Sequence, residues 1–205
     1  MAASLPYTSG AMLSAARHAI QHGSAAAPCS GFHHAGFRSS GGFCTFNGLM
    51  VTACALRAEG AKTIGILDCD HHYGDGTDDI IEAIDAESWI RHETIGARWS
   101  EPNYAGRFLA ALPSIVESMR GCDVLLYQAG ADPHIYDPQG GWLTTDELRH
   151  RDAIVFDGAR ALDIPIAWNL AGGYQRDLAG TIAPILEIHL NTALEWIRAF
   201  SRSAR

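Results

Sequence analysis

The 205-residue sequence has little positive charge. Its 15 lysines and arginines stand against 23 aspartates and glutamates, a net charge of −8. Binding to nucleic acid or to an anionic membrane needs a basic surface, so neither is expected as a direct partner. No stretch approaches the ~18 apolar residues of a membrane span, and residues 1–10 hold no basic segment followed by an apolar one. We therefore expect neither a membrane helix nor a signal peptide, and predict a cytoplasmic protein.

Cysteine and the common nucleotide-binding motifs are also scarce. The five cysteines form an odd set without a CxxC pair, which excludes a disulfide framework and a thiolate zinc site and leaves small buried thiols as the expectation. The sequence has no GxGxxG, no GxxxxGK[ST] and no GxSxG segment. It therefore indicates neither a phosphate-binding loop of those types nor a serine nucleophile.

Short apolar runs alternate with helical patterns, which is typical of an α/β protein with a parallel sheet. We predict strands over residues 62–69, 89–95, 123–129 and 164–170. We predict helices over residues 8–21, 44–58, 77–86, 103–119, 145–162 and 176–199, with Thr77 as the N-cap of the third. The chain has no linker, repeat or low-complexity tract, so we expect one domain over residues 1–205.

Acidic and histidine residues gather where the predicted strands end. Asp68, Asp70 and His72 alternate after one strand, so they would share a face of an extended chain, and Asp132 follows another strand. Crowded carboxylates repel unless a cation neutralises them, and three protein ligands with an open position are typical of catalytic zinc. Asp70, His72 and Asp132 are therefore the predicted metal ligands. A solvated acidic turn, with a capping role for Asp132, is the alternative.

The doublet His33-His34 has no cysteine or third histidine nearby and so suits acid/base work better than metal ligation. Amide hydrolysis needs a base for the attacking water and an acid for the leaving amine, and Asp68 and Asp75 are candidates to support the two imidazoles. A structural role of the doublet in its loop is the alternative. Tyr174, which follows two glycines, could donate a hydrogen bond to a developing oxyanion.

In their order along the chain, these segments resemble the motif set of the histone deacetylase superfamily, which includes bacterial histone deacetylase-like amidohydrolases and acetylpolyamine amidohydrolases. The matching segments are residues 30–35, 41–47, 68–77, 129–132 with 137–138, and 172–174. The resemblance runs from about Thr8 to His189. It implies an arginase/deacetylase-like fold, a parallel sheet with helices on both faces in three αβα layers.

The resemblance also implies an activity, the zinc-dependent hydrolysis of an N-acetyl amide, in acetyl-lysine or an acetylpolyamine, to acetate and a free amine. The roles it implies are one Zn²⁺ bound by Asp70, His72 and Asp132; His34 as general base with His33 as its electrostatic partner; Asp68 and Asp75 orienting His33 and His34; Tyr174 polarising the acetyl carbonyl; and Gly42 and Phe43 lining the acyl channel. Acetylated amines would be the partners.

Some positions depart from the family pattern. Residues 90–92 lack the serine of the family's potassium loop, so K⁺ is a doubtful cofactor. Family members are typically longer at the N-terminus, so we expect an N-terminally short catalytic domain with an uncovered edge strand at which a second copy could pair. Two other functions compete. One is an arginase-like dimanganese hydrolase, which requires a different order of metal ligands along the chain. The other is a catalytically impaired remnant, which would only bind metal or an acetylated ligand.

Overall fold

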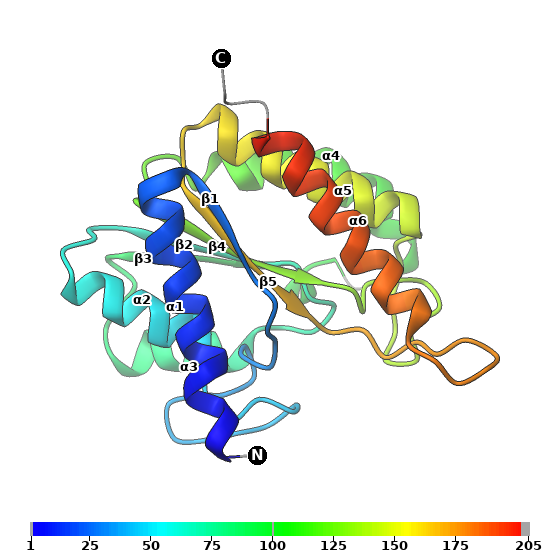
Figure 1. The fold of residues 1–205 in the computed structure, drawn as a ribbon, viewed down its shortest axis with the longest axis horizontal. Coiled ribbons are helices and arrows are strands. Elements are labelled where there is room, and N and C mark those ends of the chain that lie inside the picture. The colour runs from blue at the N-terminus through cyan, green and yellow to red at the C-terminus, as the bar shows by residue number, and fades with distance from the viewer. Residues whose placement is uncertain (1, 100, 202–205) are drawn as a thin grey trace.

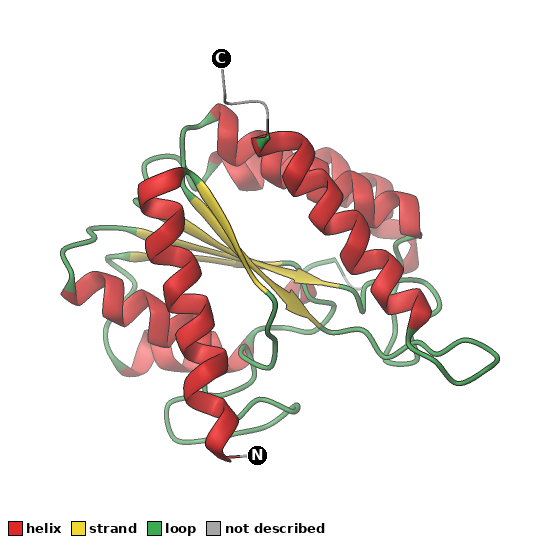
Figure 2. Ribbon diagram, in the orientation of Figure 1, coloured by secondary structure: helices red, strands yellow, loops and turns green. Residues whose placement is uncertain are grey.

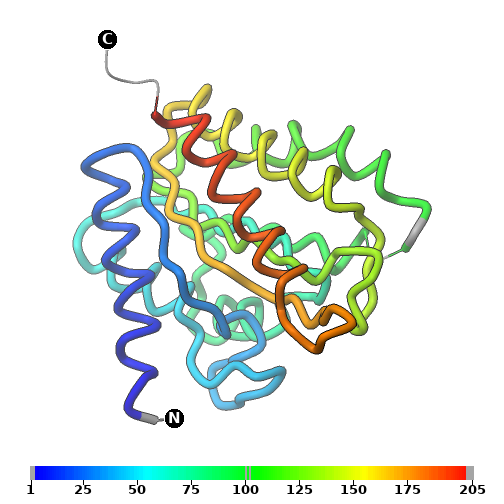
Figure 3. The backbone as a smooth tube through the Cα atoms, turned by 45° about the vertical axis from the view of Figure 1, so that its right-hand side comes forward, coloured from blue at the N-terminus to red at the C-terminus, as the bar shows by residue number. Residues whose placement is uncertain are grey.

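The computed structural model describes residues 2–99 and 101–201, which form a parallel sheet between two layers of helices. The strands are β1 (Ser24–Ala27), β2 (Ile64–Asp68), β3 (Ile90–Thr94), β4 (Val124–Gly130) and β5 (Ile166–Ala171). Their order is β1-β5-β4-β2-β3, and every pairing is parallel. β1 runs alongside β5 at one edge of the sheet (Figure 3).

Helices cover both faces of the sheet (Figure 1). The helices on one face are α1 (Leu5–His22), α2 (Gly48–Ala58) and α3 (Asp75–Ala83), and those on the other are α4 (Ala105–Glu117), α5 (Thr145–Ala161) and α6 (Ala183–Phe200). Short 3-10 turns span Ala2–Ser4, Ile95–Ala97 and Pro102–Tyr104. This arrangement confirms the predicted three-layer α/β class. Within residues 2–99 and 101–201, no helix combines the length and apolar character needed to cross a membrane.

The central strands β2 and β4 are buried along their whole length. Alternate side chains enter the two cores, so Leu67 and Tyr127 pack on the α4–α6 side while Ile66 and Leu126 pack on the α1–α3 side. A strand covered on both faces has no solvent side to keep polar. This explains why these strands are nearly continuous apolar runs in the sequence.

Two predicted elements differ from the structure at the β1–α2 connection. β1 was not among the predicted strands, because its sequence Ser-Ala-Ala-Ala has little intrinsic preference for a strand. The prediction that residues 44–47 are helical is wrong. α2 begins at Gly48 because the side chain of Asn47 accepts a hydrogen bond from the Met50 N–H (3.1 Å) and caps the helix.

Two other boundaries also need correction. The N-cap of α3 is Gly74, not Thr77, which is buried in the first turn. Residues 176–182 are not helical, because the carboxylate of Asp177 accepts hydrogen bonds from the Ala179 and Thr181 N–H groups and closes a turn ahead of α6. The expectation of buried cysteines holds for Cys44, Cys69 and Cys122, but Cys29 is half-buried and Cys54 is exposed.

Buried Asn47 connects three segments of the chain. Besides capping α2, its Nδ2 donates to the Ala35 carbonyl (3.2 Å) and to Thr77 Oγ1 in α3 (3.0 Å). We expect Asn47→Ala to lower the free energy of unfolding by about 2–3 kcal/mol, because a cap is lost and buried polar groups lose their partners. Urea denaturation measures the change.

The matched control is Thr144→Ala, which removes the cap of α5 at an exposed position where water can replace the lost bonds. It should cost about 1 kcal/mol. Equal losses in the two variants would contradict a connecting role for Asn47.

Candidate functional site

The carboxyl ends of the strands meet at one edge of the sheet, where loops gather beyond the arrowheads (Figure 2). Parallel α/β sheets place their ligand sites at this edge. Asp68 ends β2, and Asp132 lies two residues beyond the end of β4. The loop after β1 carries His33 and His34, and the loop after β5 carries Tyr174. The structure therefore brings the residues predicted from the sequence to one place.

Asp70, His72 and Asp132 form a compact group. Nδ1 of His72 lies 2.9 Å from Oδ2 of Asp132 and 3.2 Å from Oδ1 of Asp70. One ligand atom from each of the three residues lies within 4.8 Å of the others, and no second group of this kind occurs in the described part of the chain. Both carboxylates are buried, while His72 is half-buried.

Burial and the charges of its neighbours shift the pKa values of residues in this group. Burial, and then the charge of Asp70, raise the pKa of Asp132 to about 6. Hydrogen bonds to Asp132 and Asp70 raise the pKa of His72 to about 10. Two buried carboxylates thus converge on one point and favour positive charge there. Two carboxylates and one imidazole are a donor set that zinc accepts, so the residues fit the predicted metal.

Glycines make room for the two carboxylates. Gly172 has φ +50°, and a Cβ built on it would overlap the carboxylate of Asp132. A Cβ on Gly130 would press against the backbone of Asp70. Backbone N–H groups hold the carboxylates from the other side, since His71 N donates to Asp132 Oδ1 (3.1 Å) and His72 N donates to Asp70 Oδ1 (3.0 Å).

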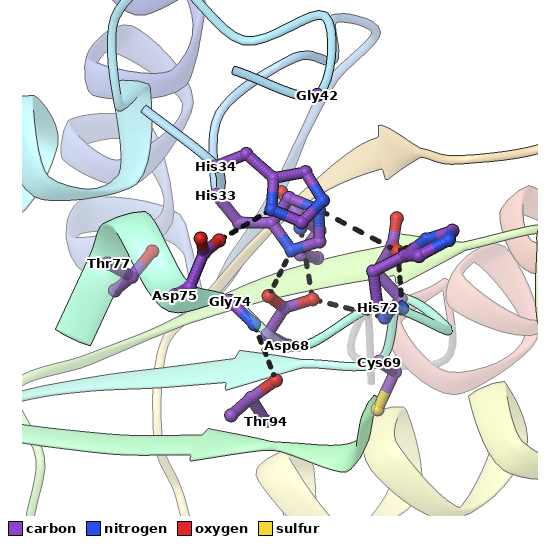
Figure 4. Close-up of polar contacts among 12 residues, drawn as sticks. His33, His34, Gly42, Asp68, Cys69, His72, Gly74, Asp75, Thr77 and Thr94 are labelled. Carbon is purple, nitrogen blue, oxygen red and sulfur yellow. Dashed lines mark hydrogen bonds and ion pairs between the residues drawn. The ribbon is translucent and has the colours of Figure 1, made fainter. Parts of the chain in front are cut away.

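Each of the paired histidines bonds its own aspartate (Figure 4). Nδ1 of His33 donates to Oδ2 of Asp68 (2.7 Å), and Nδ1 of His34 donates to Oδ1 of Asp75 (2.6 Å). The two rings lie 4.0 Å apart between centroids, and Nε2 of His33 is 3.7 Å from Oδ1 of Asp70. Because a carboxylate can only accept, it fixes the proton on Nδ1 and leaves Nε2 available for chemistry.

Asp68 is fully buried and well partnered. It accepts hydrogen bonds from His33, from the Asp70 N–H (3.1 Å) and from Gln128 Nε2 (3.0 Å). Burial alone would lower the pKa of His33, but the charge of Asp68, its hydrogen bond and the charges of Asp70 and Asp132 together outweigh burial and raise that pKa to about 9. Burial would likewise raise the pKa of Asp68, but the charge and hydrogen bond of His33, with the charge of His92 and the Asp70 N–H, together hold it below its usual range. Gln128 is a site residue that the sequence analysis missed.

The predicted alternation of Asp68, Asp70 and His72 on one strand face needs a correction. β2 ends at Asp68, and residues 70–72 form a bend instead of continuing the strand. Asp68 therefore contacts His33, whereas Asp70 and His72 turn toward Asp132. The three residues do meet at one site, but the bend brings them there.

A small pocket of about 50 Å³ opens onto Asp70, and its walls include Phe32, Gly42, Phe43, Gln128 and Tyr174. Phe43 is 87% exposed, with its ring centroid 6.1 Å from that of Tyr174, so it lies at the mouth. Gly42 packs over the ring of His34, where a Cβ would overlap the ring. Burial and the charge of Asp132 raise the pKa of Tyr174 to about 12, which keeps its hydroxyl a hydrogen-bond donor.

Asp137 fixes the loop that carries Tyr174. Its carboxylate is buried and accepts hydrogen bonds from the Tyr174 N–H (2.7 Å) and the Gln139 N–H (2.9 Å). The sequence analysis gave this residue no role, although the Asp-Pro pair at residues 137–138 signals a turn. The expectation for K⁺ stays untested. His92 of residues 90–92 lies in β3 and donates from Nδ1 to Asp78 (2.6 Å).

Comparison with known proteins finds one family repeatedly. A family model of the histone deacetylase domain matches residues 1–91. An acetylpolyamine amidohydrolase of Mycoplana ramosa is 52% identical over 48 residues, 23% of this chain and 14% of that protein. An uncharacterised protein of Picosynechococcus is 27% identical over 186 residues, 82% of this chain and 62% of that protein. The crystal structure of an acetylpolyamine aminohydrolase from Burkholderia pseudomallei superposes with a TM-score of 0.72 at 21% identity, covering 95% of this chain and 61% of that one.

The likeness to the solved aminohydrolase confirms the predicted arginase/deacetylase-like αβα fold. The chain spans 62% of the Picosynechococcus relative and 61% of the solved aminohydrolase. The activity and substrate of this chain therefore do not follow from the matches alone. They have to be inferred from the geometry of the pocket.

We expect Gly172→Ala to weaken binding of a divalent ion at least about tenfold, because the new methyl group would displace the carboxylate of Asp132. Gly180→Ala is the matched control, since Gly180 also has positive φ (+77°) but open space around its Cβ position. Both variants should lose about 1 kcal/mol of stability from backbone strain. Competition with a chelating dye measures affinity, and equal affinity in both variants would contradict the crowding at Asp132.

Proposed function

We propose that the chain belongs to the histone deacetylase superfamily, whose domain model matches residues 1–91, and that it is a zinc-dependent deacetylase. It would hydrolyse an N-acetyl amide to acetate and a free amine, with residues 1–205 acting as one catalytic domain. One observation carries the proposal: a group of metal-ligand type and two histidine–aspartate pairs lie together at the carboxyl ends of the strands, and His33, Asp70 and Tyr174 line one pocket there.

Asp70, His72 and Asp132 would hold the metal. A bound Zn²⁺ would supply a Lewis acid and a nucleophilic water at neutral pH. Its two carboxylate ligands would offset much of its charge and so weaken it as a Lewis acid. The histidines and Tyr174 must therefore contribute part of the stabilisation of the transition state.

The two histidines have different roles in the proposed reaction. His34 is the less buried of the two, and Asp75 fixes its Nδ1 proton, so its Nε2 can take the proton of the attacking water and later deliver it to the leaving nitrogen. His33 is buried against Asp68, and its charge and hydrogen-bond interactions with that carboxylate favour the protonated imidazole. It would act as an electrostatic partner, while Tyr174 donates to the acetyl oxygen.

The pocket supports an acetylated amine as substrate. Phe32, Gly42 and Phe43 give it apolar or small walls leading toward Asp70, which suits a thin aliphatic chain that ends in an acetyl group. The similar proteins include acetylpolyamine amidohydrolases and a plant histone deacetylase. Acetyl-lysine and acetylpolyamines are therefore the substrate classes to compare. A cytoplasmic location, the doubt about K⁺ as a cofactor, and pairing of a second copy at an edge strand such as β1 stay predictions.

A second candidate function is a catalytically impaired relative that binds metal or an acetylated ligand without turnover. The observation in its favour is that Phe43 is 87% exposed, so the outer wall of the pocket is thin. Metal analysis together with assays on acetyl-lysine and acetylpolyamine substrates separates the two functions.

The deacetylase proposal predicts about one zinc per chain and activity that His34→Ala abolishes. His18→Ala, which changes an exposed histidine of α1, is the matched control and should retain activity. Bound zinc without turnover on any of these substrates would favour the impaired relative, and failure to bind zinc would contradict both functions.

We expect Tyr174→Phe to bind zinc normally and to lower kcat by about 10²–10³-fold, because the variant loses a donor to the developing oxyanion. Steady-state kinetics on an acetyl-lysine reporter measure the change. Tyr136→Phe, the same change at a tyrosine that is 76% exposed, is the control. Unchanged turnover in Tyr174→Phe would rule out the assigned role.

A further inference from the structure

Arg151 of α5 is an unusual residue in the core. It is 0% exposed and is among the largest fully buried side chains of the protein. A buried guanidinium loses its hydration and must be paired and hydrogen-bonded to be tolerated. Its contacts therefore show what this position requires.

The guanidinium bonds the two strand ends that lead to the carboxylates of the site. Its Nη1 donates to the carbonyl of Gly130 (2.6 Å) and to that of Cys69 (3.2 Å). Cys69 immediately precedes Asp70, and Gly130 lies two residues before Asp132. One nitrogen of one side chain thus bonds the backbone at the end of β4 and just after the end of β2.

These carbonyls lie where the regular pairing of β2 and β4 stops. The paired register ends at Asp68 and Gln128, and the Cys69 N–H makes the next bond to the Gln128 carbonyl (3.0 Å). Beyond that point the chain after β2 bends toward the site, while β4 continues to Gly130 paired only with β5. Here the bonds from Arg151 to the Cys69 and Gly130 carbonyls take the place of the hydrogen bonds between β2 and β4, and they fix the distance between these two segments.

The guanidinium is itself fixed in place. Its Nε donates to Oδ1 of Asp152 (2.8 Å), which neutralises the buried charge. Asp152 also accepts hydrogen bonds from the Tyr127 hydroxyl of β4 and from Thr192 Oγ1 of α6 (2.6 Å). The guanidinium is therefore anchored to elements on both sides and cannot follow a displaced loop.

We propose that Arg151 is a positioning residue that holds Asp70 and Asp132 at metal-binding separation by bonding the carbonyls of Cys69 and Gly130. The inference rests on the metal site of the proposed function. Asp70 and Asp132 repel each other, so their loops need a restraint that does not depend on the bound ion. Arg151 touches neither carboxylate group in the contacts described above, and it acts through the backbone.

The test is the zinc dissociation constant, measured by competition with a chelating dye on folded protein. Arg151→Met should raise the dissociation constant by about 10–100-fold, the usual effect of losing a group that orients metal ligands. Arg151→Lys keeps the charge beside Asp152 but loses the planar fork, so it should raise the constant by a smaller factor. If Arg151→Met fails to fold, Arg151→Lys alone decides.

Thr192→Val is the matched control. It removes a hydrogen bond to Asp152 from the same buried network and should lower the melting temperature, but it leaves both carbonyl bonds in place. Its zinc affinity should stay within about twofold of the wild type. Arg151 variants with wild-type affinity, or with no greater loss than Thr192→Val at a similar melting temperature, would overturn the inference alone. A wild-type chain that binds no zinc would overturn the proposed function as well.

Discussion

The repulsion between two buried carboxylates, Asp70 and Asp132, is the constraint on which the rest of the site depends. They extend from the ends of neighbouring parallel strands, so the sheet brings them together regardless of their charge. Burying like charges without compensation costs several kcal/mol. The imidazole of His72, which lies within hydrogen-bonding distance of both, shows where positive charge is favoured.

The residues around the two carboxylates make their close approach possible in several ways. Gly130 and Gly172 leave space for the carboxylates, and backbone N–H groups of residues 71 and 72 stabilise them. Asp68 and Asp75 then orient His33, which lines the pocket, and the neighbouring His34. The aspartates of the site thus have two different roles, and the neighbours of each carboxylate decide which role it has. One pair of carboxylates crowds a single point, while each of the other pair supports one imidazole.

Much of the central fold could be predicted because β2, β4 and β5 are buried strands with apolar runs. β1 could not, since three alanines carry no strand signal and only its pairing with β5 defines it. The ligands and the histidine pairs were also accessible, because acids and histidines clustered at strand ends point to metal chemistry. The bend at residues 70–72 was not, because it depends on contacts with Asp132.

The supporting residues were the hardest to foresee. Gln128 lies within an apolar strand and Arg151 within a helix rich in charge, so local sequence gives no sign that one borders the pocket and the other is fully buried. Asp137 reads as an ordinary turn residue, although its carboxylate holds the Tyr174 backbone. Such roles arise from long-range contacts, and spacing along the chain does not encode them.

The central claim is that Asp70, His72 and Asp132 form one divalent-metal site. The most direct measurement is a titration of metal-free protein with Co²⁺, followed by visible absorption. The account predicts saturation at one ion per chain, d–d bands of a low-coordinate ion and no thiolate charge-transfer band, with all of this lost in Asp132→Asn. Absence of saturable binding, or a strong thiolate band from a cysteine ligand, would contradict it.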